Sequence, residues 1–277
     1  MTAADLRTVR VLDGAGAQVA AVGGKAAALD RLIGLGFPVP PAAALSTHAY
    51  REIVAQPHVA AAIDQVRQSA SPGDVERRAV DDAFLAATLP PDLTHELGEI
   101  ARTLCPNGEP MAVRSSATAE DSATFSFAGQ YRSFLGVHTE ADLERAVRLV
   151  WAALWHPAPT VYRRHWGIPD ADVAMGVLIM RQVDAVTAGV AFTVDPTSGR
   201  DVVRVEWVRG TAERLVGGES TPSVLLVPRT GADPTCADVP VGELRDLVLR
   251  AEAAFGVPQD VEWVFDGQRI LLVQARP

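Results

Sequence analysis

The feature that most constrains the fold is a change of pattern partway along the chain. Helical signals dominate its first part: one helix is predicted over 24–36, and residues 58–104 divide at proline-containing turns into three helical segments. After the turn at 105–108, most of the predicted elements are strands. Because helices and strands are largely segregated along the sequence, we predict an α+β fold in two lobes, with a helix-rich lobe over 1–172 and a strand-rich lobe over 173–277.

The remaining elements follow from the same patterns of apolar spacing. Strands at 111–115 and 130–137 should pair with each other. Helices are predicted over 140–155, 158–166 and 241–255. The strand-rich lobe should contain strands at 173–183, 186–194, 201–208 and 223–228, followed by a closing hairpin at 260–275.

The composition narrows the classes of function. A net charge of −9 without a compensating basic stripe argues against nucleic acid as a partner. The apolar runs are far shorter than a membrane span and the first residues form no apolar signal region, so we expect a cytoplasmic protein without a membrane partner. The two cysteines lie far apart, outside any CxxC spacing, and none of the six histidines has the paired spacing of zinc ligands.

A segment rich in small and hydroxyl side chains, residues 111–130, is a candidate for binding an anion. A short apolar run ends at Arg114, and Ser115, Ser116 and Thr118 follow at once. Backbone N–H groups, hydroxyls and one guanidinium can approach the same phosphate there, because no bulky side chain blocks them. The alternative is a Ser/Ala-rich surface loop that follows a strand.

The only lysine of the chain, Lys25, lies in the glycine-flanked segment 22–29, and the other basic residues among the 25 are all arginines. A lysine carries a slim point charge that can reach one phosphate oxygen through a narrow gap, whereas the guanidinium of an arginine is a broad fork. We interpret Lys25 as a second phosphate-binding cation. Biased codon usage together with chance is the alternative.

The closing hairpin carries polar side chains whose facing depends on the strand register. A two-residue turn would pair Glu262 with Leu271 and turn Gln274 to the other face. A three-residue loop with Gly267 in the left-handed region would instead pair Glu262 with Leu272. The hairpin can hold a ligand on one face only in the second register.

In that second register, Glu262, Gln274 and Arg276 share a face. The other face would carry Trp263, Leu271 and Val273. A carboxylate and an amide oxygen side by side form half a shell for Mg²⁺, which prefers oxygen ligands and takes the rest from phosphates and water. Arg276 would add a phosphate contact. The alternative is a solvated hairpin face that simply carries polar residues.

Five motifs in the same order together resemble the ATP-binding domain of the pyruvate phosphate dikinase and phosphoenolpyruvate synthase family, which rifampicin phosphotransferase also uses. They are VGGKAAALDRLIGLGFPVPP at 22–41, AVRSSATAEDSATFSFAGQ at 112–130, VWAALWHPAPTVYRRHWGI at 150–168, AGVAFTVDPTSGR at 188–200, and VEW with VQARP between 261 and 277. The resemblance implies an ATP-grasp fold in which ATP lies in the cleft between two lobes.

The resemblance also implies roles for individual residues. Lys25 and Arg114 match the catalytic, phosphate-binding cations, and Glu262 and Gln274 match the Mg²⁺ ligands. Arg276 matches a further phosphate contact. The other implied ATP-binding residues are Ser115, Ser116 and Thr118, then Gly129 and Gln130 in a mobile turn at 126–130, and Met180, Gln182 and Val183 on a hinge strand at 177–183 beside the adenine. Glu206 matches a family acid for which no role is assigned.

Two positions depart from the family pattern. Members often carry glutamine where this chain has Met180, so adenine recognition is expected to use backbone groups there. The GLGE-type loop is altered at 209–213, and Ser223 replaces the aspartate that often follows the next proline. Nucleotide selectivity therefore follows less directly from the resemblance than phosphate binding does.

In the family, ATP phosphorylates a histidine on a swivelling domain that follows the QARP motif. None of the six histidines here has the Thr-Ser-Gly-Gly-type context of that residue. The resemblance thus implies a Mg·ATP-dependent phosphotransferase, a dikinase-type kinase domain or subunit, whose acceptor histidine lies on a separate domain or partner chain. Two alternatives are a stand-alone ATP-grasp kinase or ligase that acts on a small acceptor, and an ATP-binding sensor without transfer. The retention of both Mg²⁺ ligands disfavours the sensor.

Overall fold

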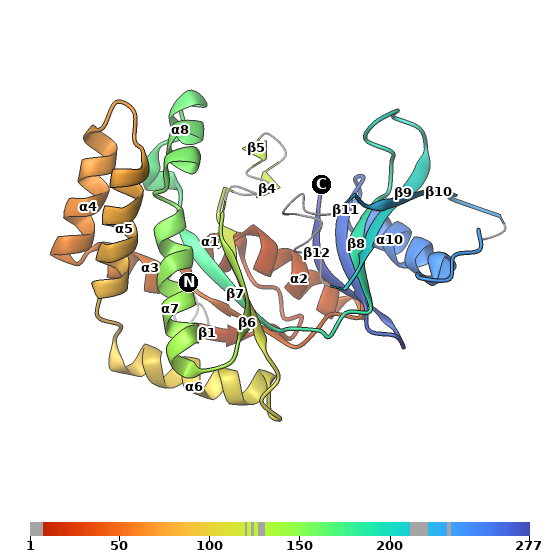
Figure 1. Cartoon of the computed structure of the whole chain (residues 1–277), viewed down its shortest axis with the longest axis horizontal. Helices are drawn as coiled ribbons and strands as arrows, with labels where there is room; N and C mark the ends of the chain where they lie inside the picture. The colour runs from red at the N-terminus through yellow and green to blue at the C-terminus, as the bar shows by residue number, and fades with distance from the viewer. Residues whose placement is uncertain (1–7, 120, 123–124, 127–130, 211–220, 232–233) are drawn as a thin grey trace. The chain divides into compact units, whose positions relative to one another are not determined.

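The fold was analysed in a computed structural model that describes residues 8–119, 121–122, 125–126, 131–210, 221–231 and 234–277. The chain divides into two compact units (Figure 1). The first unit comprises residues 1–27 and 41–182, and the second comprises 28–40 and 183–277. Helix α2 (Gly24–Gly34) therefore begins in the first unit and ends in the second.

The first unit is built around a five-stranded antiparallel sheet. Its strand order is β1-β2-β7-β3-β6, so that β7 lies at the centre of the sheet. The strands are β1 (Val9–Val11), β2 (Ala42–Leu45), β7 (Met175–Arg181), β3 (Met111–Ala117) and β6 (Ser133–Val137). Two short strands, β4 (Asp121–Ser122) and β5 (Phe125–Ser126), pair with each other. The predicted pairing of 111–115 with 130–137 is confirmed by the pairing of β3 with β6.

Helices supply most of the apolar side chains that pack against this sheet. They are α1 (Val19–Val22), α3 (Thr47–Val54), α4 (Pro57–Gln68), α5 (Asp74–Ala86), α6 (Pro91–Leu104), α7 (Glu140–Ala153) and α8 (Pro157–His165), with a 3₁₀ turn at Asp170–Asp172. The apolar stripe predicted on α7 is buried, and it joins the strand side chains in one large core. This is the expected behaviour of an amphipathic helix on a sheet.

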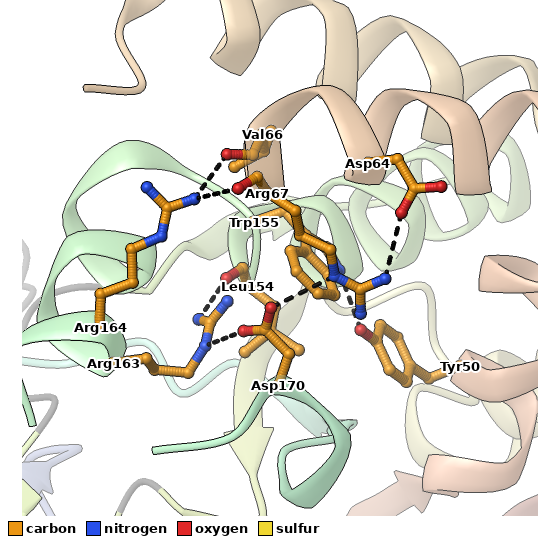
Figure 2. Close-up of polar contacts among 9 residues, drawn as sticks. All are labelled: Tyr50, Asp64, Val66, Arg67, Leu154, Trp155, Arg163, Arg164 and Asp170. Atoms are coloured by element: carbon orange, nitrogen blue, oxygen red, sulfur yellow. Dashed lines mark hydrogen bonds and ion pairs between the residues drawn. The ribbon is translucent and has the colours of Figure 1, made fainter. Parts of the chain in front are cut away.

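A buried polar cluster fastens α4 to the end of α8 (Figure 2). The Arg163 side chain is 1% exposed, and its guanidinium donates to Asp170 Oδ1 at 3.1 Å and to the Leu154 carbonyl at 2.7 Å. Arg164 donates to the carbonyls of Val66 and Arg67, which lie in the last turn of α4 and have no partner within that helix. The cluster therefore supplies hydrogen-bond donors to carbonyls at the end of α4 and acceptors to the buried guanidinium of Arg163.

The second unit contains a second five-stranded antiparallel sheet, in the order β10-β9-β8-β11-β12. The strands are β8 (Thr187–Phe192), β9 (Val202–Arg209), β10 (Ser223–Pro228), β11 (Asp260–Phe265) and β12 (Ile270–Arg276), and helix α10 (Val241–Phe255) contacts β12. Segment 28–40 joins this unit through a hydrogen bond from Leu272 N–H to the Pro38 carbonyl and through Arg250, which lies over the ring of Phe37.

The residues of this second sheet alternate between a buried face and a more accessible one. Val203, Val205 and Val261 are fully buried, whereas their neighbours Arg204 and Glu262 are only partly buried. Side chains alternate along a strand, so these two sets lie on opposite faces. Arg204, Glu206 and Glu262 thus lie on the more accessible face.

The α+β class predicted from the sequence is confirmed, but the lobe boundary expected at 172/173 differs from the observed division. Strand β7 pairs with β2 on one side and with β3 on the other, which makes it the central strand of the first unit. In addition, residues 28–40 belong with the C-terminal unit. Apolar patterns predict that a segment is a strand, but they do not say which strands it will pair with.

Candidate functional site

The start of helix α2 is pressed onto strand β3, and a glycine makes this approach possible. Gly23 precedes the helix with φ +82°, and a Cβ built on it would lie 1.7 Å from the Ser116 carbonyl oxygen. A Cβ built on Gly176 of β7 would similarly lie 2.3 Å from the Val22 carbonyl oxygen. Glycine is the only residue that fits both the positive φ and the contact at position 23. The glycine that precedes Gly24 and Lys25 therefore fixes where α2 begins relative to β3.

Lys25 and the two serines predicted to bind phosphate lie together in the first unit. The Lys25 Nζ donates to Ser115 Oγ at 3.3 Å, and the Ala26 N–H donates to Ser116 Oγ at 3.0 Å. Both serines are almost completely buried. Their hydroxyls thus orient the lysine and the start of α2, and in this arrangement both are engaged within the protein.

Arg114 lies in the middle of β3, opposite Ser133 on β6 and Leu178 on β7. It is the one partly exposed residue in an otherwise buried strand. Thr118, which follows the strand, accepts a hydrogen bond from the Ala174 N–H at 3.0 Å through its Oγ1. The threonine hydroxyl therefore holds the end of β3 to the start of β7.

The predicted hinge strand ends at the boundary between the two units, since Gln182 is the last residue of the first and Val183 begins the second. Met180 is buried on β7, between Ala42 and Ala112 on the neighbouring strands. Gln182 is committed to the first unit, because its Oε1 accepts from the Gly136 N–H at 2.6 Å. Gly129 and Gln130, also predicted to bind ATP, lie outside the described residues, as do the side chains of β5.

The hairpin β11–β12 places the two predicted Mg²⁺ ligands opposite each other, in a register that differs from both predicted registers. Glu262 lies directly opposite Gln274, whereas Trp263 pairs with Leu272, so Val273 is an extra residue in β12. Both predicted pairings of Glu262, with Leu271 or with Leu272, are therefore wrong. A β-bulge adds one residue to one strand and so shifts the register by one residue from one side of the bulge to the other. It is this bulge that sets the carboxylate and the amide on one face.

Because of the bulge, two neighbouring residues lie on a different face of the hairpin from the one predicted. Leu271 pairs with Val264 and packs with Ala188 in one apolar cluster, and Val273 packs against the same cluster. Val264 lies two residues from Glu262 and shares its face. Leu271 and Val273 thus lie on the side of Glu262, not on the opposite face as predicted. Trp263, fully buried, does lie on the opposite face.

Asp260, which was not among the predicted site residues, holds Arg276 on the face that also carries Glu262 and Gln274. The two residues are opposite each other in the ladder, and the guanidinium donates to Asp260 Oδ2 through Nε at 2.9 Å and Nη2 at 2.5 Å. Burial raises the pKa of the Asp260 carboxyl, while the charge of Arg276 acts in the opposite direction. The signal in the sequence was the spacing, since Asp260 stands two residues before Glu262 on the same strand.

Glu206 also lies on this face, in the same row as Glu262. Val190 on β8 pairs with Glu206 on one side and with Glu262 on the other. Arg204 donates to Glu206 Oε1 at 2.5 Å and to the buried Asp195 Oδ1 at 3.4 Å. The unassigned family acid is therefore oriented by an arginine that is itself held by a buried carboxylate.

The described residues contain no group of three or more His, Cys, Asp or Glu side chains that could hold a metal ion. A pair of oxygen ligands such as Glu262 and Gln274 is nevertheless what Mg²⁺ commonly uses when phosphates and water complete its shell. None of the helices in the described part of the chain combines the length and the hydropathy that a bilayer crossing requires.

Comparison with known proteins identifies the family. Residues 19–233 match the AMP/ATP-binding domain of pyruvate phosphate dikinase. The chain belongs to this family, as its motifs predicted, and it is thus an ATP-binding domain of the pyruvate phosphate dikinase and phosphoenolpyruvate synthase type. The match covers α1 through β10 and so includes Lys25 and Arg114.

Among the relatives is the rifampicin phosphotransferase of Streptomyces sviceus, which is 36% identical over 301 aligned residues that cover 94% of this chain and 34% of that protein. The phosphoenolpyruvate synthase of Aeropyrum pernix is 29% identical, over 92% of this chain and 40% of that enzyme. A prodigiosin synthesizing transferase of Serratia marcescens is 30% identical, over 92% and 31%. The chain thus spans between about a third and two fifths of the length of these relatives.

Proposed function

We propose that this chain binds Mg·ATP and transfers a phosphoryl group from it to a histidine on a separate domain or partner chain. The observation that carries the proposal is the Glu262–Gln274 pair, in which a partly buried carboxylate lies directly opposite an almost fully buried amide, on the same face of the second sheet as Arg276. An acid, an amide and an arginine in adjacent positions suit a phosphate–Mg²⁺ ligand better than they suit either an apolar or a purely anionic one.

The first unit supplies the complementary chemistry. Lys25 stands in the first turn of α2, where the helix dipole also favours negative charge. Arg114 adds a guanidinium that can bind phosphate oxygens in a bidentate way. In our proposal, these two cations bind phosphate oxygens of ATP.

Glu262 and Gln274, directly opposite each other in the ladder, would hold Mg²⁺ through their side-chain oxygens. The chemistry that Mg²⁺ supplies when bound is neutralisation of the phosphate oxygens. The residues of the chain then position the phosphates: Lys25 and Arg114 stabilise the charge of the loose transition state, and no protein nucleophile is needed within this chain.

In the transfer step that we propose, a ring nitrogen of the acceptor histidine forms a bond to phosphorus while a phosphoanhydride P–O bond of ATP breaks, and the electron pair leaves with the nucleotide. Relatives named phosphoenolpyruvate synthase and rifampicin phosphotransferase support a phosphotransfer role, and their greater length supports an acceptor that lies outside the present chain.

The test uses ATP labelled in its β- or its γ-phosphate, with Mg²⁺, and the purified chain either alone or with the product of the neighbouring reading frame. We expect label on an acid-labile, base-stable site of the partner. Turnover driven by a small acceptor without any partner would instead favour a stand-alone kinase, and ATP binding without any transfer would favour a sensor. Failure to bind ATP at all would refute every one of these functions.

A further inference from the structure

A partly buried carboxylate in the helical layer of the first unit is contacted by two arginines and a histidine. Asp81 on α5 has a side chain that is only 14% exposed. Its Oδ1 lies 2.8 Å from His156 Nε2, and its Oδ2 accepts from Arg77 Nη1 and Arg132 Nη1, both at 3.4 Å. A carboxylate with several charge-assisted partners is held in one orientation far more firmly than an exposed surface pair.

These partners come from three different parts of the first unit. Arg77 is on the same helix as Asp81, and His156 lies between α7 and α8. Arg132 immediately precedes β6, and its guanidinium also lies 5.5 Å from the ring centroid of Phe134 on that strand. Asp81 therefore connects the helical layer to the beginning of β6.

Strand β6 needs such a connection. It ends the order of the described strands in the first sheet and pairs with β3 alone. Its pairing with β3 is also irregular between Met111 and Val113. An edge strand with a broken ladder has fewer hydrogen bonds to fix its position than a central strand has.

The place where β6 is fastened is next to the phosphate-binding arginine. Arg132 is adjacent to Ser133, and Ser133 is the residue directly opposite Arg114. Alternation along the strand places Arg132 and Phe134 on one face and Ser133 on the face of Arg114. Asp81 thus holds β6 from one side of the sheet, one residue away from the position that borders Arg114 on the other side.

We propose that Asp81 is a positioning residue for the phosphate site: acting through Arg132, it fixes the start of β6 and hence the neighbour of Arg114. This inference rests on the proposed function, since it assumes that Arg114 binds phosphate. It goes beyond the family resemblance, because neither Asp81 nor Arg132 belongs to the residues that the resemblance carries.

The test compares Asp81→Asn with Asp74→Asn in the whole chain. Asp74 is a matched control because it lies on the same helix and also pairs with Arg77, at 3.2 Å, but has no link to Arg132 in the described contacts. We expect the Kd for Mg·ATP to rise about fivefold or more in Asp81→Asn, while Asp74→Asn stays within about twofold of the unchanged protein, a range typical of lost positioning contacts.

A second variant, Arg132→Gln, should reproduce the loss, and the double variant Asp81→Asn/Arg132→Gln should be no worse than either single one. Arg132→Lys should restore part of the affinity, a rescue that a merely structural role would not require. Should Asp81→Asn fail to fold, Arg132→Gln and Arg132→Lys decide the matter on their own.

Arg114→Ala separates the two proposals. If Arg114→Ala leaves ATP binding unchanged, the proposed role of Arg114 fails, and the inference about Asp81 fails with it. If Arg114→Ala abolishes binding but Asp81→Asn and Arg132→Gln bind ATP as well as Asp74→Asn does, only the inference about Asp81 is overturned.

Discussion

Replacing Gly23 by alanine tests the idea that the α2–β3 contact sets the position of Lys25. The new Cβ would lie 1.7 Å from the Ser116 carbonyl oxygen, whereas real Cβ atoms essentially never come within 3.0 Å of such an atom. The two backbones would therefore have to move apart by about 1.3 Å. A shift of that size breaks the hydrogen bond from the Ala26 N–H to Ser116 Oγ, which is 3.0 Å long in the native arrangement.

The cost has two parts. A non-glycine residue held at φ +82° costs about 1–3 kcal/mol, and a lost buried hydrogen bond costs about 1 kcal/mol more. A total of about 3 kcal/mol corresponds to a fall in Tm of roughly 6–12 °C for a unit of this size. Because Lys25 moves with the helix start, the affinity for Mg·ATP should fall by about tenfold or more.

Gly16→Ala is the matched control. Gly16 has almost the same positive φ, +87°, but a Cβ there would meet nothing within 4 Å. It should therefore cost only the same conformational part, about 1–3 kcal/mol, without the lost hydrogen bond, and leave ATP affinity unchanged. Thermal unfolding and titration with Mg·ATP are the measurements. Equal effects of Gly23→Ala and Gly16→Ala on both quantities would refute the reasoning.

Two further predictions concern the second unit. If Glu262 is one of two protein oxygen ligands of Mg²⁺, as we propose, Glu262→Ala should raise the Mg²⁺ concentration needed for half-maximal ATP binding by about tenfold or more. Glu243→Ala on α10 should leave that concentration unchanged. An unchanged Mg²⁺ requirement in Glu262→Ala would exclude Glu262 as a ligand. Arg229 Nη2 donates a hydrogen bond of 2.6 Å to Glu252 Oε1 and lowers the pKa of the Glu252 carboxyl. The contribution of this pair to stability is therefore present above pH 4.5, the ordinary pKa of a glutamate, and is lost as the pH falls through the lower pKa of the folded state. Glu252→Gln should thus lower the free energy of unfolding by about 1 kcal/mol at pH 7. It should also make that free energy fall less steeply at acidic pH than it does in Glu243→Gln. Urea unfolding that shows the same fall at acidic pH in both variants would contradict this.

Much of the local structure could be predicted from the sequence, because it depends on local patterns. Helix α10 has the predicted bounds, 241–255, and the apolar residues of its inner stripe are buried as amphipathic spacing requires. The strands from β7 to β10 also lie where runs of apolar and β-branched residues indicated them. Family membership, too, followed from short motifs.

The missed features all depend on contacts between distant segments. The bulge at Val273 leaves no mark in the alternation of β12, so turn length alone predicted the wrong register. The lobe boundary was misplaced because β7 gains its partners from residues far away in the sequence. Asp81 and Arg132 are unremarkable as isolated charges, and only the fold brings Arg132 and His156 to the Asp81 carboxylate.

The bulge in β12 has a consequence for how such hairpins can change during evolution. Val273 has no paired residue in β11, because the pairs Trp263–Leu272 and Glu262–Gln274 lie on either side of it. A one-residue deletion at this position would regularise the strand and still leave Glu262 opposite Gln274. A deletion there is therefore neutral for the facing of Glu262 and Gln274, and homologous hairpins can differ by one residue in the spacing of the acid and the amide while presenting the same pair.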